Sequence, residues 1–330
     1  MRILMTNHSL KDTGGTEKWT HALAVEFMRR GHEVDVFTFM RGVTSEKLEE
    51  AGARIVEEPR DEYNVMFSNH CTCLGFLTTR LSCPKIHTSH GPAHQLEIPT
   101  LGADVYVAVS WEVRARHAAL GFYQELIGNG VDLDDFYDRL IPPYEPAQPI
   151  EPRNPRVLSM CKDVNATNMV RIACEQAGMD FDSAHYTDDI VWDVASEMRA
   201  CDIVVACGRS AIEALACGRD VLVFDWRDPR EGPTADGWIT EANVRDLAQS
   251  NFSCRHRGHH WGLGELIEAL KARPSPTGKP GWQRQWASNE ADVRKQADAY
   301  LALVPKAEEK HQNQVHDPDL TAEYQLEEVR

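Results

Sequence analysis

Long apolar stretches are missing from this chain of 330 residues, in which no run reaches the roughly 18 residues that a membrane-spanning helix needs. The amino terminus, MRILMTNHS, reads as a strand and has neither the charged nor the apolar region of a signal peptide. We therefore expect a cytoplasmic protein without a membrane span.

Positive charge is also scarce. The chain has 35 Lys and Arg against 51 Asp and Glu, which gives a formal net charge of -16. A chain of this charge has no general attraction for nucleic acid or anionic lipid. The composition disfavours nucleic acid as a partner, although a local basic groove is compatible with it.

The cysteines lack the paired spacing of a disulfide framework or a closed zinc site. Nine of them, an odd number, are scattered between Cys71 and Cys254, which suits a reducing compartment. The segment CRHRGHHW, residues 254–261, contains metal-ligand residue types without the paired spacing that zinc requires. We expect no metal and no cofactor.

Nucleotide fingerprints of fixed spacing are absent too: neither GxGxxG nor a P-loop occurs. The first strand-to-helix turn instead carries the pair Gly14 and Gly15, with Glu17 in the first helical turn. Such a pair either serves a turn that needs positive φ or lets a phosphate approach the helix amides. A dehydrogenase is disfavoured.

What is present is an alternation of short apolar runs with helical patterns, which predicts an α/β fold with parallel sheets. The first half has six candidate strands: Ile3–Thr6, Val34–Phe39, Asn64–Ser68, Ile86–Thr88, Val105–Val109 and Leu126–Gly128. Gly31 is expected to end the first helix in a left-handed conformation. Residues 141–155 contain six prolines and read as a linker.

The alternation resumes after the linker. We expect two domains, at 1–140 and 156–281, because 330 residues exceed one ordinary core. A last helix is predicted over 282–303, followed by a polar tail, 304–330, that is partly disordered or loosely packed. The segment DWRDPREGPTADGW, residues 225–238, reads as a long polar loop.

Three segments resemble retaining, family 4-type glycosyltransferases. The opening MRILMTNHSLKDTGGTEKWTHALAVEFMRRGHEVDVFTF is similar to their strand, GG-x-E, helix and RGHEV series. GADVYVAVSWEVRARHAALGFYQELIGNGVDLDDF resembles their ADxxxAVS and NGVD signature, and ACDIVVACGRSAIEALACGRDVLVFD resembles their nucleotide-binding segment. The resemblance implies a GT-B fold, in which two Rossmann-like domains face a central cleft. The second domain would hold a nucleotide sugar, and the first domain would hold the acceptor. In this family the last helix often crosses back to the first domain.

The resemblance and the chemistry of sugar transfer together suggest the site residues. Cationic groups and helix-end amides can stabilise a departing nucleoside diphosphate without a metal. Glu213 matches the family glutamate that binds ribose, and His90 matches a histidine that contacts the donor sugar. We expect Glu213 and His90 to be catalytic. The expected donor-binding residues are Gly14, Gly15, Lys162, Gly208, Arg209, Ser210 and Glu213, and the possible substrate rim comprises Glu17, His87, Asp225, Asp236, Arg255 and Arg257.

The chain also departs from the family pattern. A glutamate usual eight positions before Glu213 is replaced by Val205, and an Arg and Lys pair is reduced to Lys162. These departures leave the donor and the stereochemical outcome open. The leading hypothesis is a hexosyl- or pentosyltransferase that acts on an unidentified acceptor hydroxyl, of a glycan, a small molecule or a modified DNA base. The alternatives are a nucleotide-sugar epimerase and a non-catalytic sugar-nucleotide binding protein.

Overall fold

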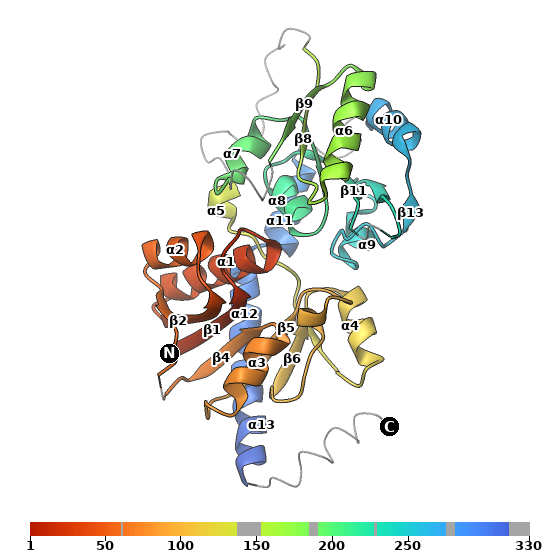
Figure 1. Cartoon of the computed structure of the whole chain (residues 1–330). Coiled ribbons are helices and arrows are strands. Elements are labelled where there is room, and N and C mark those ends of the chain that lie inside the picture. Colours follow the sequence, from red (N-terminus) through yellow and green to blue (C-terminus); the bar gives the residue numbers. More distant parts are fainter. Residues whose placement is uncertain (61, 137–152, 185–190, 228–229, 275–280, 317–330) are drawn as a thin grey trace. The chain divides into compact units, whose positions relative to one another are not determined.

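The computed structural model describes residues 1–60, 62–136, 153–184, 191–227, 230–274 and 281–316. Its contacts divide the chain into two compact units (Figure 1). The first contains Met1–Gly130 and the chain from Val293 onward, and the second contains Val131–Asp292. The division falls inside the NGVD segment, and the predicted Pro-rich linker lies almost wholly outside the described residues.

The first unit alternates strands and helices along the chain and is completed by the last two helices. Its elements are β1 (Arg2–Ser9), α1 (Gly15–Arg29), β2 (Glu33–Met40), α2 (Val43–Glu50), β3 (Arg54–Val56), β4 (Val65–Asn69), α3 (Cys71–Thr78), β5 (Lys85–Ser89), the 3₁₀ turn η1 (Gln95–Glu97), β6 (Val105–Ala108), α4 (Trp111–Ala118), β7 (Glu125–Leu126), α12 (Val293–Ala302) and α13 (Val304–His316).

The sheet of this unit is parallel in all its pairings, in the order β3-β2-β1-β4-β5-β6-β7. Alternate residues of β1 enter different cores: Ile3 and Met5 pack with α1 and α12, whereas Leu4 packs on the side of α3. Because successive strand side chains point to opposite faces, this pattern means that both faces are covered. Figure 1 shows α1 and α3 on opposite faces of the sheet.

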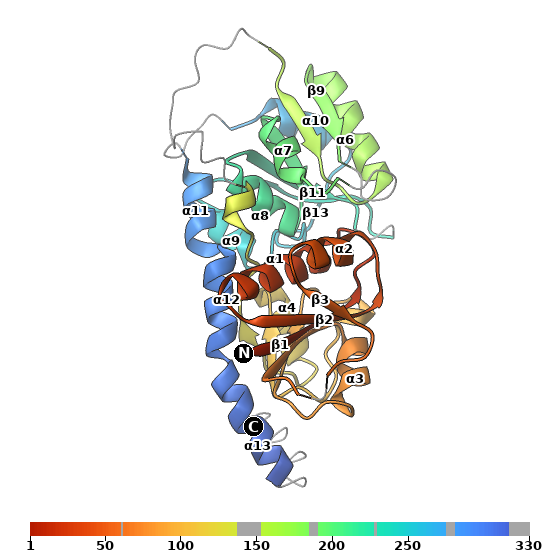
Figure 2. The ribbon, with the colours of Figure 1, turned by 90° about the vertical axis from the view of Figure 1, so that its left-hand side faces the viewer.

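The first unit depends on the far end of the chain. Tyr300 of α12 is fully buried, packs against Trp19 and Phe67, and shares a 3.0 Å hydrogen bond with Thr88. In Figure 2, α12 and α13 run alongside the first sheet and α1. Helix α12 therefore supplies core side chains that the first 130 residues lack.

The second unit has the same alternation with a different end. Its elements are α5 (Leu133–Phe136), β8 (Arg156–Ser159), α6 (Val164–Ala177), β9 (Asp180–Ser183), α7 (Val194–Arg199), β10 (Ile203–Ala206), α8 (Arg209–Ala216), β11 (Asp220–Asp225), β12 (Thr234–Trp238), α9 (Val244–Ala248), β13 (His259–His260), α10 (Leu263–Lys271) and α11 (Trp282–Glu290).

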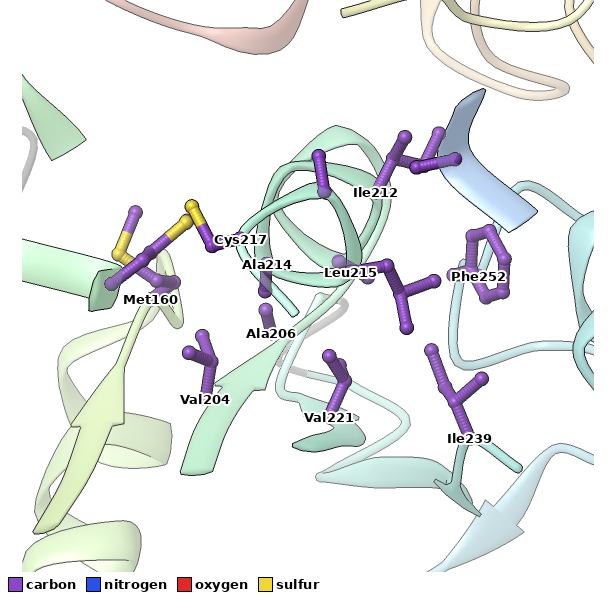
Figure 3. Close-up of a cluster of buried hydrophobic side chains, with 14 of the residues drawn as sticks. Met160, Val204, Ala206, Ile212, Ala214, Leu215, Cys217, Val221, Ile239 and Phe252 are labelled. Atoms are coloured by element: carbon purple, nitrogen blue, oxygen red, sulfur yellow. The ribbon is translucent and has the colours of Figure 1, made fainter. Parts of the chain in front are cut away.

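The second sheet has the order β13-β12-β11-β10-β8-β9, with β12 and β13 antiparallel to their neighbours and the other strands parallel. Val204 and Ala206 of β10 face the core under α8, while Ile203 and Val205 face α6 and α10. In Figure 3, Ala214 and Leu215 project from α8 toward this sheet. Both faces of β10 are therefore buried.

Most sequence-based elements are confirmed. Each of the first five predicted strands overlaps an observed strand, and the sixth meets β7 at Leu126. Gly31 has a φ of 80°, as the predicted helix end requires. The α/β fold class is confirmed as well.

Two predictions of local structure are wrong. Residues 225–238 are not one loop, because Asp225 ends β11 and β12 covers Thr234–Trp238. The helix predicted over 282–303 is broken at Asp292, where the chain bridges to Val131. Within the predicted tail, the described residues form a helix as far as His316, and buried Ala307 together with an ion pair between Lys306 and Glu125 holds α13 to the first unit. Residues 317–330 lie outside the described residues, so partial disorder of the tail stays a prediction.

Candidate functional site

In the second unit, the strand order reverses between β8 and β10. The chain leaves β8 through α6 toward β9 on one side, whereas β10 leads through α8 to β11 on the other. Ligands of open α/β sheets bind outside the carboxyl ends of the strands at such a switch point. The segments that leave these two strand ends are therefore the candidate site: residues 160–163 after β8 and 207–210 after β10.

The two helices that begin at this switch point differ at their first turns. Helix α6 is capped by its own carboxylate, since Asp163 Oδ1 accepts hydrogen bonds from the amides of Asn165 at 2.7 Å and Ala166 at 3.0 Å. Helix α8 has Gly208 at its N-cap, without a side-chain capping bond. The N-terminus of a helix attracts anions, and only α6 already has one there. Of the two helix starts, that of α8 is therefore the candidate anion site.

Gly208 has a backbone that other residues rarely adopt, with φ 62° and ψ -136°. An added Cβ would meet no atom within 4 Å, so glycine is required by the torsion angles and not by crowding. The Gly208 amide donates a 2.8 Å hydrogen bond to the Phe252 carbonyl. This bond fixes the loop after α9 against the start of α8.

Arg209 and Glu213 contact each other. Arg209 Nε donates to Glu213 Oε1 at 2.9 Å, and the two residues are only 8% and 4% exposed. Burial lowers the pKa of Arg209, and the carboxylates of Glu213 and Asp132 oppose part of that shift. Glu213 is therefore not an ordinary exposed helix carboxylate. The sequence suggested two separate ligand contacts, and the structure shows one buried ion pair.

Lys162 and Asp225 lie near the carboxyl ends of β8 and β11, the two strands that flank β10. Lys162 is exposed directly beyond β8, next to Asp163. Asp225 is buried at the end of β11 and accepts hydrogen bonds from the Trp226 amide at 2.8 Å and the Cys207 thiol at 3.3 Å. Asp225 thus stabilises the strand ends from within and does not lie on an exposed rim.

Asp236 is a buried carboxylate in β12 that holds a basic loop. It accepts hydrogen bonds from the backbone amides of His256 at 3.3 Å, Arg257 at 2.7 Å and Gly258 at 3.4 Å. The side chains of Arg255 and Arg257 are exposed. Asp236 therefore supports the loop from within, and the rim role of the two arginines stays a prediction.

We expect Asp236→Ala to destabilise the loop by about 1–3 kcal/mol, because three amides lose their acceptor. Hydrogen exchange of the His256, Arg257 and Gly258 amides measures this directly. Asp236→Asn is the matched variant, since it keeps one carbonyl oxygen and should retain most of the protection. Equal exchange in the wild-type and alanine proteins would contradict this role.

The first unit has its own switch point, between β1 and β4. Helix α1 begins at Gly15, and Gly14 is its N-cap without a side-chain capping bond. However, Glu17 folds back over this turn: its Oε2 accepts a 2.8 Å bond from Thr16 and lies 2.5 Å from where a Cβ on Gly14 would be. A carboxylate therefore covers the Gly14 turn, and a phosphate would reach it only if Glu17 moved.

His90 lies at the carboxyl end of β5 in a defined orientation. Its Nε2 is 3.1 Å from Asn69 Oδ1, and Asn69 Nδ2 donates to Thr20 at 3.0 Å. Because the amide oxygen only accepts, Nε2 carries a proton, and Nδ1 is the ring nitrogen directed away from Asn69. The Trp19 ring meets the imidazole edge-on with centroids 5.0 Å apart.

Glu97 holds this region together. Its Oε2 accepts a 2.6 Å hydrogen bond from the His90 amide, and its Oε1 is 3.4 Å from His70 Nε2. Burial would raise the pKa of Glu97, but the hydrogen bond from His70 and the nearby imidazoles of His90 and His70 outweigh burial and lower it to about 2. Glu97 is thus an anion at neutral pH.

Sequence analysis missed His70, Glu97 and Asn69. His70 has a φ of 64°, which is uncommon for a residue with a side chain and costs on the order of 1–3 kcal/mol. Its Nδ1 accepts a 3.1 Å bond from the His8 amide. The polar run Ser68–His70 at the end of a buried strand was an available signal, whereas no pattern around Glu97 indicated its contacts with His90 and His70.

His87 does not line a rim. It is fully buried within β5 and its Nδ1 is 2.9 Å from Ser68 Oγ. Burial lowers the pKa of His87 to about 3. The sequence prediction failed because His87 precedes the strand end by two residues, so its side chain lies inside the sheet layer.

We expect the His87 imidazole to make the first unit acid-sensitive. In the unfolded chain His87 binds a proton below the ordinary histidine pKa of 6.5, whereas in the folded chain it stays unprotonated down to about pH 3. Stability is therefore present above pH 6.5 and falls as the pH drops, by about 3 kcal/mol between pH 7 and pH 4. Urea unfolding of the wild-type and His87→Asn proteins at both pH values measures this. An equally steep fall in the variant would contradict the assignment.

Among the described residues, no group of three or more His, Cys, Asp or Glu side chains is arranged to hold a metal ion. Nor does any helix within the described ranges combine the length and apolar character needed to span a bilayer.

No protein-family model matches the chain, and no curated protein matches it in sequence. Solved structures do match. Anabaena Alr3699/HepE in complex with UDP and glucose has a TM-score of 0.62 at 15% identity, over 92% of this chain and 99% of that chain. A glycosyltransferase from Rickettsia africae ESF-5 has a TM-score of 0.59 at 12% identity, over 93% and 98%.

A putative UDP-N-acetylglucosamine 2-epimerase from Listeria monocytogenes also matches, with a TM-score of 0.54 at 11% identity over 92% of this chain and 95% of that chain. At such identities the similarity establishes the architecture and leaves the activity and the family 4-type subdivision as hypotheses. Two α/β units with mostly parallel sheets, matched over nine tenths of the chain, give this protein the GT-B fold.

Proposed function

We propose that this protein is a glycosyltransferase that moves a hexosyl or pentosyl group from a nucleoside-diphosphate sugar to an acceptor hydroxyl. The observation that supports this most is the start of α8. It lies at the switch point of the second sheet with Gly208 at its N-cap, while the neighbouring α6 is capped by Asp163. A diphosphate is the kind of ligand that such a helix end favours.

The donor diphosphate is proposed to lie against the backbone of Gly208 and Ser210, with Lys162 supplying positive charge. Arg209 begins α8 directly after Gly208 and is buried in its ion pair with Glu213, and it is proposed to turn part of its charge to the diphosphate when the donor binds. Leaving-group charge is then stabilised by fixed cations and helix amides, so the proposed reaction needs no metal. We further propose retention at the anomeric carbon, on the family resemblance alone.

The roles of Glu213 and His90 are proposed from the same resemblance. Glu213 Oε1 is engaged by Arg209, so its Oε2 is the atom proposed to accept a hydrogen bond from a ribose hydroxyl. His90 is proposed to contact the donor sugar through Nδ1, because Nε2 is directed at Asn69. Gly14 and Gly15 are proposed to bind the donor only in a conformation in which the Glu17 carboxylate has moved away from their turn.

The similar structures include a complex with UDP-glucose, in HepE, and a UDP-GlcNAc 2-epimerase from Neisseria meningitidis bound to UDP-GlcNAc with a TM-score of 0.51. These ligands belong to those proteins. They support a nucleotide sugar as the co-substrate here and make UDP the first nucleotide to test. They equally support the epimerase alternative.

A thermal-shift panel of UDP-, GDP-, ADP- and CDP-sugars tests the proposal. A ligand that binds only the folded state stabilises it and so raises the melting temperature. At a ligand concentration of 100 times the Kd, the stabilisation is about 2.7 kcal/mol. Arg209→Lys and Glu213→Gln are preferable to alanine because they preserve the volume of the buried pair, and both should reduce the shift of the true donor. A panel without any shift in the wild-type protein refutes the proposal.

Product analysis separates the alternatives. Free nucleotide released from the donor supports a transferase, an isomerised donor supports an epimerase, and binding without turnover supports a non-catalytic binding protein. The acceptor is proposed to be a hydroxyl compound on the first unit's side. The negative net charge of -16 disfavours a DNA acceptor.

A further inference from the structure

An exposed group of rings lies on the α3 side of the first sheet. Phe39, at the end of β2, is 43% exposed and packs edge-on against Phe37 at 5.0 Å and Phe76 at 5.4 Å. Phe76 of α3 is stacked on Phe37 and has the Arg80 guanidinium 3.8 Å from its centroid. We call Phe37, Phe39 and Phe76 the aromatic platform.

The aromatic platform is held rigidly although part of it faces solvent. Phe37 is only 2% exposed and anchors the group in the core under α3. Each ring contacts the other two, so an arriving ligand would meet a surface that is already ordered. Such preorganisation lowers the entropic cost of binding.

Polar groups border the aromatic platform on the side of the switch point. The His8 ring is 5.4 Å from Phe39, and its Nδ1 is 2.9 Å from the hydroxyl of exposed Thr72. The His8 amide in turn bonds to His70 at the end of β4. The platform therefore continues into the carboxyl edge between β1 and β4, where ligands of α/β sheets collect.

The mixture of an apolar surface and adjoining polar groups restricts the ligand class. Burial first, and then the nearby His70, lower the pKa of His8. A neutral imidazole has one donor and one acceptor nitrogen, of which Nδ1 is already paired with Thr72. A hydrocarbon would cover this imidazole and the Thr72 hydroxyl and would offer neither of them a hydrogen bond. A pyranose has an apolar CH face for the rings and hydroxyls for the imidazole.

We infer that the aromatic platform, together with His8 and Thr72, binds a pyranose ring of the acceptor, so that the acceptor is a carbohydrate. This inference names the substrate class of the proposed transferase, and the role of the carbohydrate as acceptor rests on that proposed function. The carbohydrate site itself requires only the first unit. Phe39 is its central residue, because it contacts both other rings and His8.

The test is a titration of the full chain with the methyl glycosides of glucose, galactose, mannose and N-acetylglucosamine, followed by saturation-transfer NMR. Phe39→Ala should weaken the best glycoside about 3- to 10-fold, since one aromatic contact is lost. Phe39→Tyr keeps the ring and should bind within about twofold of wild type.

Tyr123→Ala is the matched control, because Tyr123 is a similarly exposed aromatic at 48%. It precedes β7, which is five strand spacings from β2, or roughly 24 Å. This variant should bind glycosides like wild type. Equal melting temperatures of the two alanine variants exclude unfolding as the cause of weaker binding.

Three results would overturn the inference: no glycoside binds, Phe39→Ala binds like Tyr123→Ala, or cyclohexanol binds as tightly as the best glycoside. Nucleotide-sugar thermal shifts on the same samples keep the two proposals separate. Shifts without glycoside binding refute the carbohydrate site and leave the transferase proposal standing. Glycoside binding that depends on Phe39, without any nucleotide shift, supports the site and refutes the proposed function.

Discussion

Arg209→Ala should destabilise the second unit by about 3–5 kcal/mol, because it leaves the Glu213 carboxylate buried without its ion-pair partner. Neither side chain is more than 7% exposed, so water cannot replace the lost contact in the folded state. Urea unfolding monitored by tryptophan fluorescence measures the change. The same variant should lose the donor-dependent thermal shift if the proposed phosphate site is correct.

The chain contains a matched control for this prediction. Arg171 and Glu175 in α6 have the same order and spacing on a helix, at 2.7 Å, but are 45% and 61% exposed. Arg171→Ala should cost only about 0.3–0.5 kcal/mol, since exposed pairs of this kind contribute little. If the Arg209 and Arg171 variants are equally stable, Arg209 is not a buried partner of Glu213.

Tyr300→Ala should destabilise the first unit by about 3–5 kcal/mol, because it removes a fully buried ring from the core. The ring contacts Trp19 at 5.5 Å and Phe67 at 5.7 Å, so the loss includes two aromatic pairs. Urea unfolding and proteolysis at moderate temperature both measure the effect. We expect β1, α1 and β4 to lose protection together, since their side chains share this core.

Tyr300→Phe separates packing from hydrogen bonding. It keeps the ring but loses the 3.0 Å bond to Thr88, which should cost about 0.5–1.5 kcal/mol. Tyr123→Ala provides an exposed comparison and should change stability by less than about 0.5 kcal/mol. A small effect of Tyr300→Ala would show that the first unit folds without α12.

The sequence predicted the local structure of one part of the candidate site. The apolar run before Gly208 and the helical pattern after it predicted a strand-to-helix turn, and glycine at that turn follows from its positive φ. The same reasoning treated Gly14 and Gly15 as equivalent to Gly208. It could not show that Glu17 covers the first turn, because a rotamer choice is not visible in a pattern.

The sequence also could not predict which side chains pair with each other. Arg209 and Glu213 were each identified, and their spacing of four on a helix allows a contact, but burial decides whether they bind each other or a ligand. Asp236 was predicted for a rim because its segment is rich in polar residues and glycine. In the structure it lies in β12, where its carboxylate accepts bonds from a loop twenty residues later.

By itself, the sequence determined the α/β class, the main strands and the turn at Gly208, because these depend on local periodicity and on backbone torsions that few residues adopt. Only the tertiary structure decided that α12 completes the first core, that Glu97 joins His70 to His90, and that Phe37, Phe39 and Phe76 form one surface. These features join residues distant in the chain, and the free energy of such contacts depends on burial and geometry that no local pattern contains.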